Sequence, residues 1–198
     1  MSKKYRSLTA AAAAGDLEAV KALLARKAAI NSRSGPYGHT PLIAAIVDNH
    51  TQVALYLLEQ KADPNATDRE RTPPLAWAMR CPYGRRKNLA LAEALLAAGA
   101  AVDGADRDGM TPLMWAANRS AVKLVEWLLA HGANVNAKTT EKHNSKRTAL
   151  MYATGIAVVQ VLLDAGADPK AVDENDMHIW EFHGHPARKL LKERAGVK

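Results

Sequence analysis

The amino-acid sequence predicts an all-α solenoid of stacked helix–turn–helix units, and three observations carry this prediction. The 198-residue chain is 48% hydrophobic but only 5% aromatic, so its core must consist mainly of Ala and Leu, the strongest helix formers. Adjacent leucines recur with spacings of 34, 38, 33 and 34 residues. Two further markers share this period, which indicates internal repeats. The leucine pairs are Leu23-Leu24, Leu57-Leu58, Leu95-Leu96, Leu128-Leu129 and Leu162-Leu163.

The second marker precedes every leucine pair except the first and predicts where the first helix of a unit begins. A Thr hydroxyl caps a free backbone N–H, and the following Pro supplies a helical φ where no donor is needed. The marker segments are Thr40-Pro41-Leu42, Pro73-Pro74-Leu75, Thr111-Pro112-Leu113 and Thr148-Ala149-Leu150.

The third marker follows each leucine pair by about seven residues: Ile30-Asn31, Pro64-Asn65, Val102-Asp103, Val135-Asn136 and Pro169-Lys170. The second helix before it has apolar positions three and four residues apart, as in 122–129. Gly99, Gly132 and Gly166 are expected to end this helix, because glycine reaches the left-handed conformation without a Cβ clash. Lys27 and Lys61 stand at the corresponding positions. A non-glycine residue there costs on the order of 1 kcal/mol if its φ is positive.

The pattern resembles the ankyrin repeat family. Segment 106–117 (Asp-Arg-Asp-Gly-Met-Thr-Pro-Leu-Met-Trp-Ala-Ala) follows the family motif closely, and 132–137 and 65–68 fit its linker. The resemblance covers roughly residues 8–196. It implies helix pairs with β-turn fingers on one edge, and a concave face formed by the fingers and the first helices.

The repeat register predicts a single domain over 7–198 after a flexible basic N-terminus at 1–6. We expect terminal units with polar outer faces to cap the array. The predicted units are an N-terminal cap at 7–33, repeats at 34–67, 68–105, 106–137 and 138–172, and a C-terminal cap at 173–198.

The chain departs from the family motif in three ways. The motif's His after Thr-Pro-Leu is absent, so we expect its hydrogen bonds to be missing. Insertions at 81–88 and 138–147 lengthen, respectively, the turn between two helices and one finger, and loops on a rigid scaffold often bind partners. The fourth repeat lacks residues after Thr154-Gly155, which leaves little turn between its helices. The residues in place of the His are Ile43, Ala76, Met114, Met151 and Glu181.

A net charge of +7 and a pI of about 9.6 raise nucleic acid as an alternative partner. The basic residues concentrate at 1–33, 81–88 and 138–147 rather than along one track. A phosphate-binding groove needs continuous positive lining with stacking aromatics. We therefore favour a solvated basic surface.

Neither catalysis nor a cofactor has a recognisable site. His178, His183 and His185 are close in sequence but fall at packing and turn positions, so we expect no metal site. Cys81 lacks a recurring His or acidic partner. Trp77, Trp115, Tyr152 and Phe182 recur at equivalent positions, which we interpret as core between the helices of each unit rather than as a binding stripe.

Because no apolar run approaches the ~18 residues of a membrane span, we expect a cytoplasmic protein. The resemblance and the lack of a recognisable catalytic site predict a non-catalytic, monomeric and bacterial protein that binds another protein. An inhibitor, immunity-type or effector role is a narrower form of this hypothesis. The expected contacts lie on finger tips and first helices: Tyr37, His39, Val47, Asp48, Arg69, Glu70, Thr72, Arg80, Arg107, Asp108, Met110, Asn118, Arg119, Lys142, Asn144 and Lys146.

Overall fold

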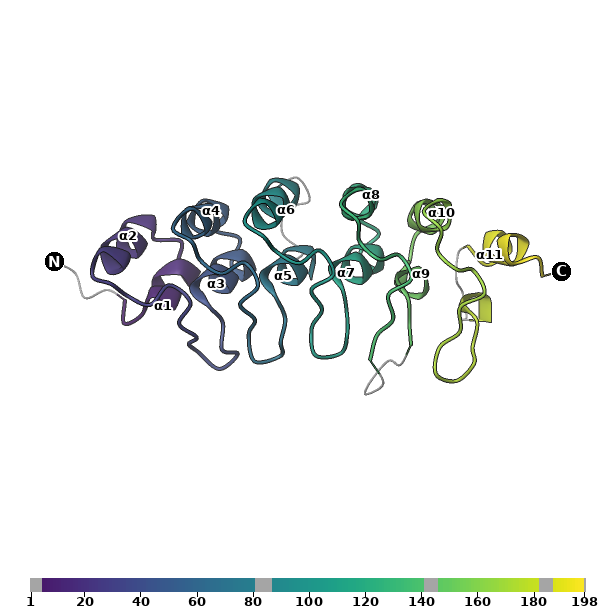
Figure 1. Ribbon diagram of the computed structural model, residues 1–198, viewed down its shortest axis with the longest axis horizontal. Coiled ribbons are helices and arrows are strands. Elements are labelled where there is room, and N and C mark those ends of the chain that lie inside the picture. Colours follow the sequence, from purple (N-terminus) through teal and green to yellow (C-terminus); the bar gives the residue numbers. More distant parts are fainter. Residues whose placement is uncertain (1–4, 81–86, 141–145, 182–186, 198) are drawn as a thin grey trace. The chain divides into compact units, whose positions relative to one another are not determined.

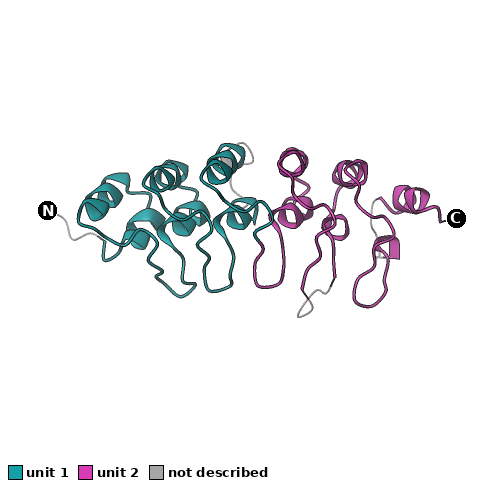
Figure 2. Cartoon of the chain, in the orientation of Figure 1, with its two compact units in different colours: residues 1–104 teal, residues 105–198 magenta. Residues whose placement is uncertain are grey.

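The computed structural model describes residues 5–80, 87–140, 146–181 and 187–197. The chain divides into two compact units, unit 1 over residues 1–104 and unit 2 over residues 105–198 (Figure 2). The described residues form helices and two isolated β-bridges, Ser34 with His39 and Val172 with His178. The predicted all-α class is therefore confirmed.

The described residues of unit 1 form three helix pairs, in which first and second helices lie in separate rows (Figure 1). In the row of first helices, α3 packs against both α1 and α5. In the row of second helices, α4 packs against both α2 and α6. The pairs are α1 (Leu8–Ala13) with α2 (Leu17–Ala25), α3 (Pro41–Val47) with α4 (Thr51–Glu59), and α5 (Pro74–Arg80) with α6 (Lys87–Ala97).

Unit 2 repeats this arrangement, with α7 against α9 and α8 against α10. The shortened fourth repeat has a first helix of only 4 residues, and its second helix follows closely. The elements are α7 (Pro112–Asn118), α8 (Val122–Ala130), α9 (Ala149–Tyr152), α10 (Ile156–Asp164), the 3-10 helix η1 (Ile179–Glu181) and α11 (Arg188–Ala195).

The repeated leucines occupy equivalent buried sites in the second helices. Leu57, Leu95, Leu128 and Leu162 are each fully buried. The Leu23-Leu24 pair is only half-buried, because α2 is the first of its row and packs against a single second helix, α4.

The predicted helix signals hold in most places. The Thr40 hydroxyl accepts from the Ile43 N–H at 3.2 Å and the Thr111 hydroxyl from the Met114 N–H at 3.3 Å. The Thr148 hydroxyl makes no such bond, although it is buried. The Met114 sulfur accepts from the Thr111 N–H at 3.5 Å. The expectation that the hydrogen bonds of the motif's His are missing is therefore wrong at this position.

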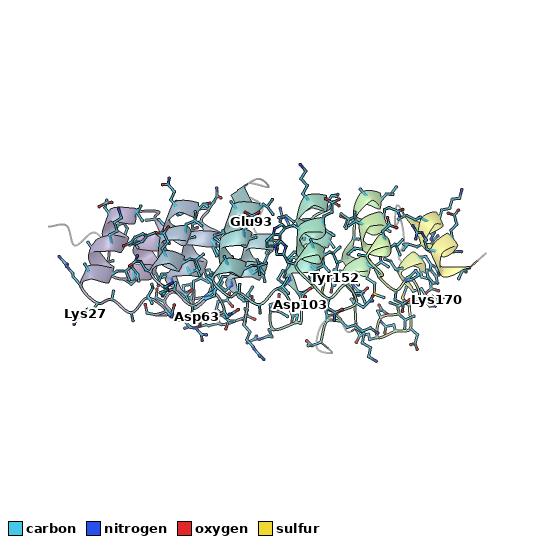
Figure 3. The ribbon with its side chains drawn as sticks, turned by 45° about the horizontal axis from the view of Figure 1, so that its top comes forward. Lys27, Asp63, Glu93, Asp103, Tyr152 and Lys170 are labelled. Atoms are coloured by element: carbon cyan, nitrogen blue, oxygen red, sulfur yellow. The ribbon has the colours of Figure 1, made fainter. Side chains whose placement is uncertain are left out.

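The glycines that follow the second helices adopt the left-handed backbone conformation, as predicted. Gly99, Gly132 and Gly166 have φ of 95°, 84° and 89°. Lys27, labelled in Figure 3, and Lys61 adopt φ of 61° and 68° without the glycine that would relieve the strain.

Asparagine side chains join successive linkers. The Asn31 carbonyl accepts from the Asp63 N–H at 3.0 Å. Asn65 binds the next linker twice, because its carbonyl accepts from the Ala101 N–H and its amide donates to the Gly99 carbonyl, both at 2.8 Å. In unit 2, the Asn136 carbonyl accepts from the Asp168 N–H at 2.9 Å, and its amide donates to the Gly166 carbonyl at 3.1 Å.

Candidate partner-binding surface

A buried aspartate shapes the second finger of unit 1, residues 68–72. The Asp68 carboxylate accepts the Glu70 and Thr72 N–H groups, each at 2.9 Å, and the Trp77 indole N–H at 2.8 Å. An Asp side chain that bonds its own backbone two residues on mimics a turn. The same side chain therefore closes the finger and fixes Trp77 at its base.

Aspartates play the same role in unit 2. Asp106 accepts from the N–H groups of Asp108 and Met110, each at 3.0 Å, and Asp173 from those of Asn175 and Met177, at 2.9 and 3.2 Å. Burial raises the pKa of the Asp106 carboxyl, although the two N–H donors oppose this shift. The sequence analysis missed these residues. Their signal is an Asp six positions before the first residue of a first helix or, for Asp173, of η1.

We define the inner surface of unit 1 as the fingers at 34–39 and 68–72 together with helices α1, α3 and α5. A row of three aromatic rings and one guanidinium group crosses this surface. The Tyr37 and His39 rings stack with centroids 5.6 Å apart, and His39 meets Trp77 edge-on at 5.5 Å. The Arg80 guanidinium lies 4.7 Å from the Trp77 ring centroid, within cation–π range. Tyr37 ends the row with 66% of its surface exposed.

The second finger holds the first one in place. The Arg69 guanidinium donates to the Pro36 carbonyl at 2.5 Å, and the Arg69 N–H donates to the Tyr37 carbonyl at 3.0 Å. A Cβ at Gly38 would lie 2.7 Å from the Arg69 Cγ, so only glycine lets this side chain cross the finger. Arg69 therefore positions Tyr37.

Burial lowers the pKa of His39, and the carboxylates of Asp68 and Asp48 oppose this shift. The His39 Nε2 lies 4.0 Å from the Asp68 Oδ2, too far for a hydrogen bond, and has no partner among the described residues. These effects favour a neutral imidazole at neutral pH.

A hollow of about 240 Å³ opens beside this row of rings. Small side chains of α1 and α3, namely Ala10, Ala13 and Ala44, line one part of it. Tyr37 and His39 line another, and the exposed Asp48 stands at the end of α3. Its remaining lining residues are Thr9, Ser34, Gly35 and Pro36.

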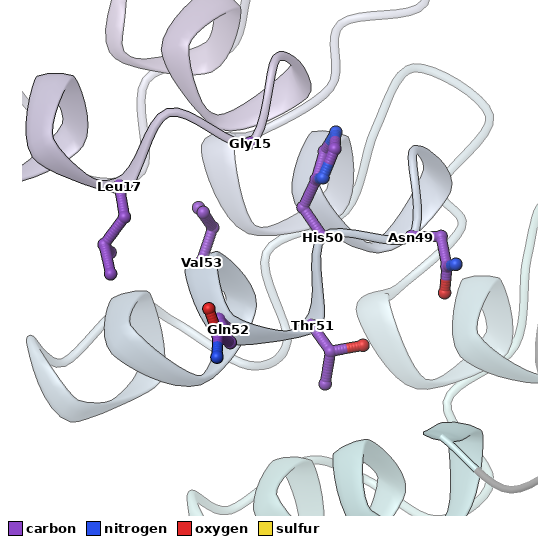
Figure 4. Close-up of a pocket in the computed structure, with 7 residues that line it drawn as sticks. All are labelled: Gly15, Leu17, Asn49, His50, Thr51, Gln52 and Val53. Atoms are coloured by element: carbon purple, nitrogen blue, oxygen red, sulfur yellow. The ribbon is translucent and has the colours of Figure 1, made fainter.

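A second groove in unit 1 lies at the turns between first and second helices (Figure 4). Its lining includes His50 and the polar side chains of Asn49, Thr51 and Gln52. A Cβ at Gly15 would come within 2.4 Å of the His50 ring. The groove contains no row of rings and none of the predicted contact residues.

The predicted contacts of unit 2 lie on its own fingers and first helix. Arg107, Asn118, Arg119 and Lys146 are exposed, and Asp108 is half-buried. The Asp108 carbonyl accepts from the Thr140 N–H at 3.0 Å, which joins two neighbouring fingers as Arg69 does in unit 1.

Two predicted contacts are buried, so the prediction that their side chains meet a partner is wrong. Thr72 has 0% and Met110 8% of its surface exposed. Each residue ends its finger by donating its N–H to the finger aspartate, and its side chain turns inward. Lys142 and Asn144 lie outside the described residues. The remaining predicted residues of unit 1 belong to the two fingers and to α3 and α5, except Asp48, which follows α3; Val47 is half-buried.

The interpretation of the recurring aromatics as core between two helices also needs correction. Trp77 is only half-buried, and its indole faces the finger through Asp68 and His39 rather than the helix pair alone. In the C-terminal segment, Trp180 is buried and stacks on His178 at 4.2 Å. Phe182 lies outside the described residues.

Neither a metal centre nor a membrane span is found in the part of the chain that the structure describes. No three His, Cys, Asp or Glu side chains gather there in a way that could hold a metal ion. His183, His185 and Cys81 lie outside that part. None of its helices combines the length and the apolar character that a bilayer requires.

The fold and this surface define a helical repeat protein of the kind that binds other proteins. The family profile described as "Ankyrin repeats (3 copies)" matches residues 3–68 and 75–173. The chain belongs to the ankyrin repeat family. Ankyrin repeats are generally non-catalytic modules for protein–protein interaction.

Comparisons with individual proteins agree. An ankyrin repeat domain from Acinetobacter baumannii AYE, solved by crystallography, is 30% identical, with a TM-score of 0.79 over 96% of this chain and 98% of that one. The Danio rerio protein named "Putative palmitoyltransferase ZDHHC13" is 31% identical over 88% of this chain. A Rickettsia bellii protein named as an ankyrin repeat protein is 33% identical over 50% of it. The chain spans only 25% and 29% of these two relatives.

Proposed function

We propose that the protein binds a partner protein through the inner surface of unit 1, with exposed residues on the fingers of unit 2 as further contacts. The observation that carries the proposal is the row from Tyr37 to Arg80. Its outer end is an aromatic side chain that is 66% exposed yet held in place by its neighbours.

Rigid placement favours tight binding. Tyr37 stacks on His39, and Arg69 holds its backbone, so little conformational entropy is lost when a partner covers the ring. Tyr, Trp and Arg are also the residue types that most often dominate binding energy at interfaces. The inner surface of unit 1 combines all three.

Several cations are already engaged within the protein, which supports a protein partner over nucleic acid. The Arg69 guanidinium donates to a carbonyl, and Arg147 and Arg194 pair with carboxylates at 3.6 and 2.9 Å. Phosphate binding requires several basic groups free to neutralise a backbone. Inhibition or effector activity would follow from the identity of the partner, and we propose either only as a consequence of this interaction.

Site-specific photocrosslinking tests the proposal. A benzophenone amino acid replaces Tyr37 in one variant and Tyr56, on the second helix α4, in the matched control. We expect the Tyr37 variant to crosslink a protein from native lysate and the Tyr56 variant not to do so. Capture through Tyr56 alone would place the partner on the opposite side of unit 1.

The captured partner then allows a quantitative measurement. We expect Tyr37→Ala with Arg80→Ala to weaken its binding by at least about tenfold, the usual effect of removing interface hot spots. The circular dichroism spectrum should stay unchanged, because both side chains are exposed. Binding that survives the double change, or that disappears after nuclease treatment, would contradict the proposal.

A further inference from the structure

The hollow beside Tyr37 has a chemistry that selects its occupant. Ala10, Ala13 and Ala44 provide a floor of methyl groups, and the Tyr37 and His39 rings form a wall. The opening also contains one charged side chain, Asp48. The site therefore combines apolar surface, aromatic faces and a negative charge.

The charge of Asp48 is unneutralised in the structure. The residue is exposed, and no described side chain forms an ion pair or hydrogen bond with its carboxylate. Burial lowers the pKa of the neighbouring His39 against the opposing influence of Asp68 and Asp48, which favours the neutral form of this imidazole. A cationic group entering the hollow would thus meet an unpaired carboxylate.

We propose that this hollow binds one arginine side chain from an extended segment of the partner protein. The arginine methylenes would lie on the alanine floor, as long charged side chains commonly cover apolar surface. The planar guanidinium would stack on the Tyr37 ring and reach Asp48, a combination for which arginine is better suited than lysine. The inference rests on the proposed function in that a partner presents the arginine.

A titration that needs no partner tests the chemistry of the hollow. The probe is the capped tripeptide acetyl-Gly-Arg-Gly-amide, added to the ¹⁵N-labelled 198-residue chain. We expect saturable shifts of the backbone amides of Ala10, Ala13, Tyr37 and Asp48. The same peptide with citrulline, which has nearly the same shape but no charge, should bind about two- to fivefold more weakly, as for loss of an exposed ion pair.

Variants assign the effect to the hollow. Asp48→Asn should reduce arginine binding to the level of citrulline, whereas Glu59→Gln, which removes an exposed charge from α4, should leave it unchanged. Ala10→Leu should block both peptides by filling the hollow from an exposed position on α1, with unchanged circular dichroism.

Three results would overturn the inference: equal binding of the two peptides, unchanged arginine binding by Asp48→Asn, or the absence of shifts around the hollow. None of them bears on the crosslinking through Tyr37. Loss of crosslinking with intact tripeptide binding would instead contradict the proposed function while leaving the arginine site in place.

Discussion

The two units build their fingers alike but leave different side chains available. In unit 1, Tyr37 is 66% exposed and Asp48 has no ionic partner among the described residues. In unit 2, the finger cation Arg147 pairs with Asp173 at 3.6 Å, and Arg188 donates to the Trp180 carbonyl at 2.6 Å. The repeat geometry thus determines where a side chain lies, whereas the residues around it determine whether it can still bind a partner.

The largest expected effect concerns the finger aspartates. Asp68→Ala leaves the buried Thr72 N–H, the partly buried Glu70 N–H and the Trp77 indole without this acceptor, so the free energy of unfolding should fall by about 2–4 kcal/mol. Asp106 is only half-buried and burial disfavours its ionisation, so Asp106→Ala should lower the free energy of unfolding by less, about 1–2 kcal/mol. Urea denaturation measures both values.

Asp68→Asn is the control for this comparison, because its amide oxygen keeps an acceptor for the finger. It should retain more stability than Asp68→Ala. Equal losses for Asp68→Ala and Asp68→Asn would contradict the role of this carboxylate as the acceptor that closes the finger.

A smaller effect is expected at the ends of the second helices. Lys61→Gly should raise the free energy of unfolding by about 1 kcal/mol, because φ of 68° strains any residue with a Cβ. Gly132→Lys in unit 2 should lower it by a similar amount, since no heavy atom lies within 4 Å of an added Cβ and only the strain counts. Thermal unfolding should shift by about 2–4 °C in opposite directions.

An unchanged or lower melting temperature for Lys61→Gly would mean that the lysine side chain compensates for its backbone strain. Lys27→Gly, at φ of 61° on α2, provides an independent repeat of the measurement in unit 1.

The smallest expected effect is a pH dependence specific to unit 1. Burial lowers the pKa of His39 below 6.5 in the folded protein, against the opposing influence of Asp68 and Asp48. As the pH falls below this value, the unfolded chain takes up a proton that the folded chain resists, so stability declines. Denaturation midpoints across this range should show a shallower decline for His39→Gln than for the unchanged protein. An identical profile would contradict the assignment.

The sequence predicted the helices better than the surface. Periodic leucines and the helix-start and helix-end residues act locally or repeat along the chain, so Thr40, Thr111 and Gly132 were assigned correctly. The burial of Thr72 and Met110 depends on how each finger folds over its aspartate, which single-residue patterns do not reveal.

The hollow beside Tyr37 could not be predicted from the sequence either. It arises because small residues of two helices face a gap beside one finger, and these residues lie 31 or more positions apart between α1 and α3. Tyr37, His39 and Asp48 were singled out as contacts, but nothing in their spacing indicated that they share one site. Asp68 and Trp77 contribute to this region and were not among the predicted contacts.

The asparagine bonds between linkers make one repeat the natural step in which such a chain can lengthen or shorten. The Asn65 and Asn136 side chains each hold backbone atoms 30 to 36 residues ahead, at matching positions of the following linker. Excising or duplicating a whole period presents each amide with an equivalent target. Removing half a period would leave each asparagine amide opposite a helix, whose backbone groups are already hydrogen-bonded. Length variants of this architecture should therefore differ by complete repeats.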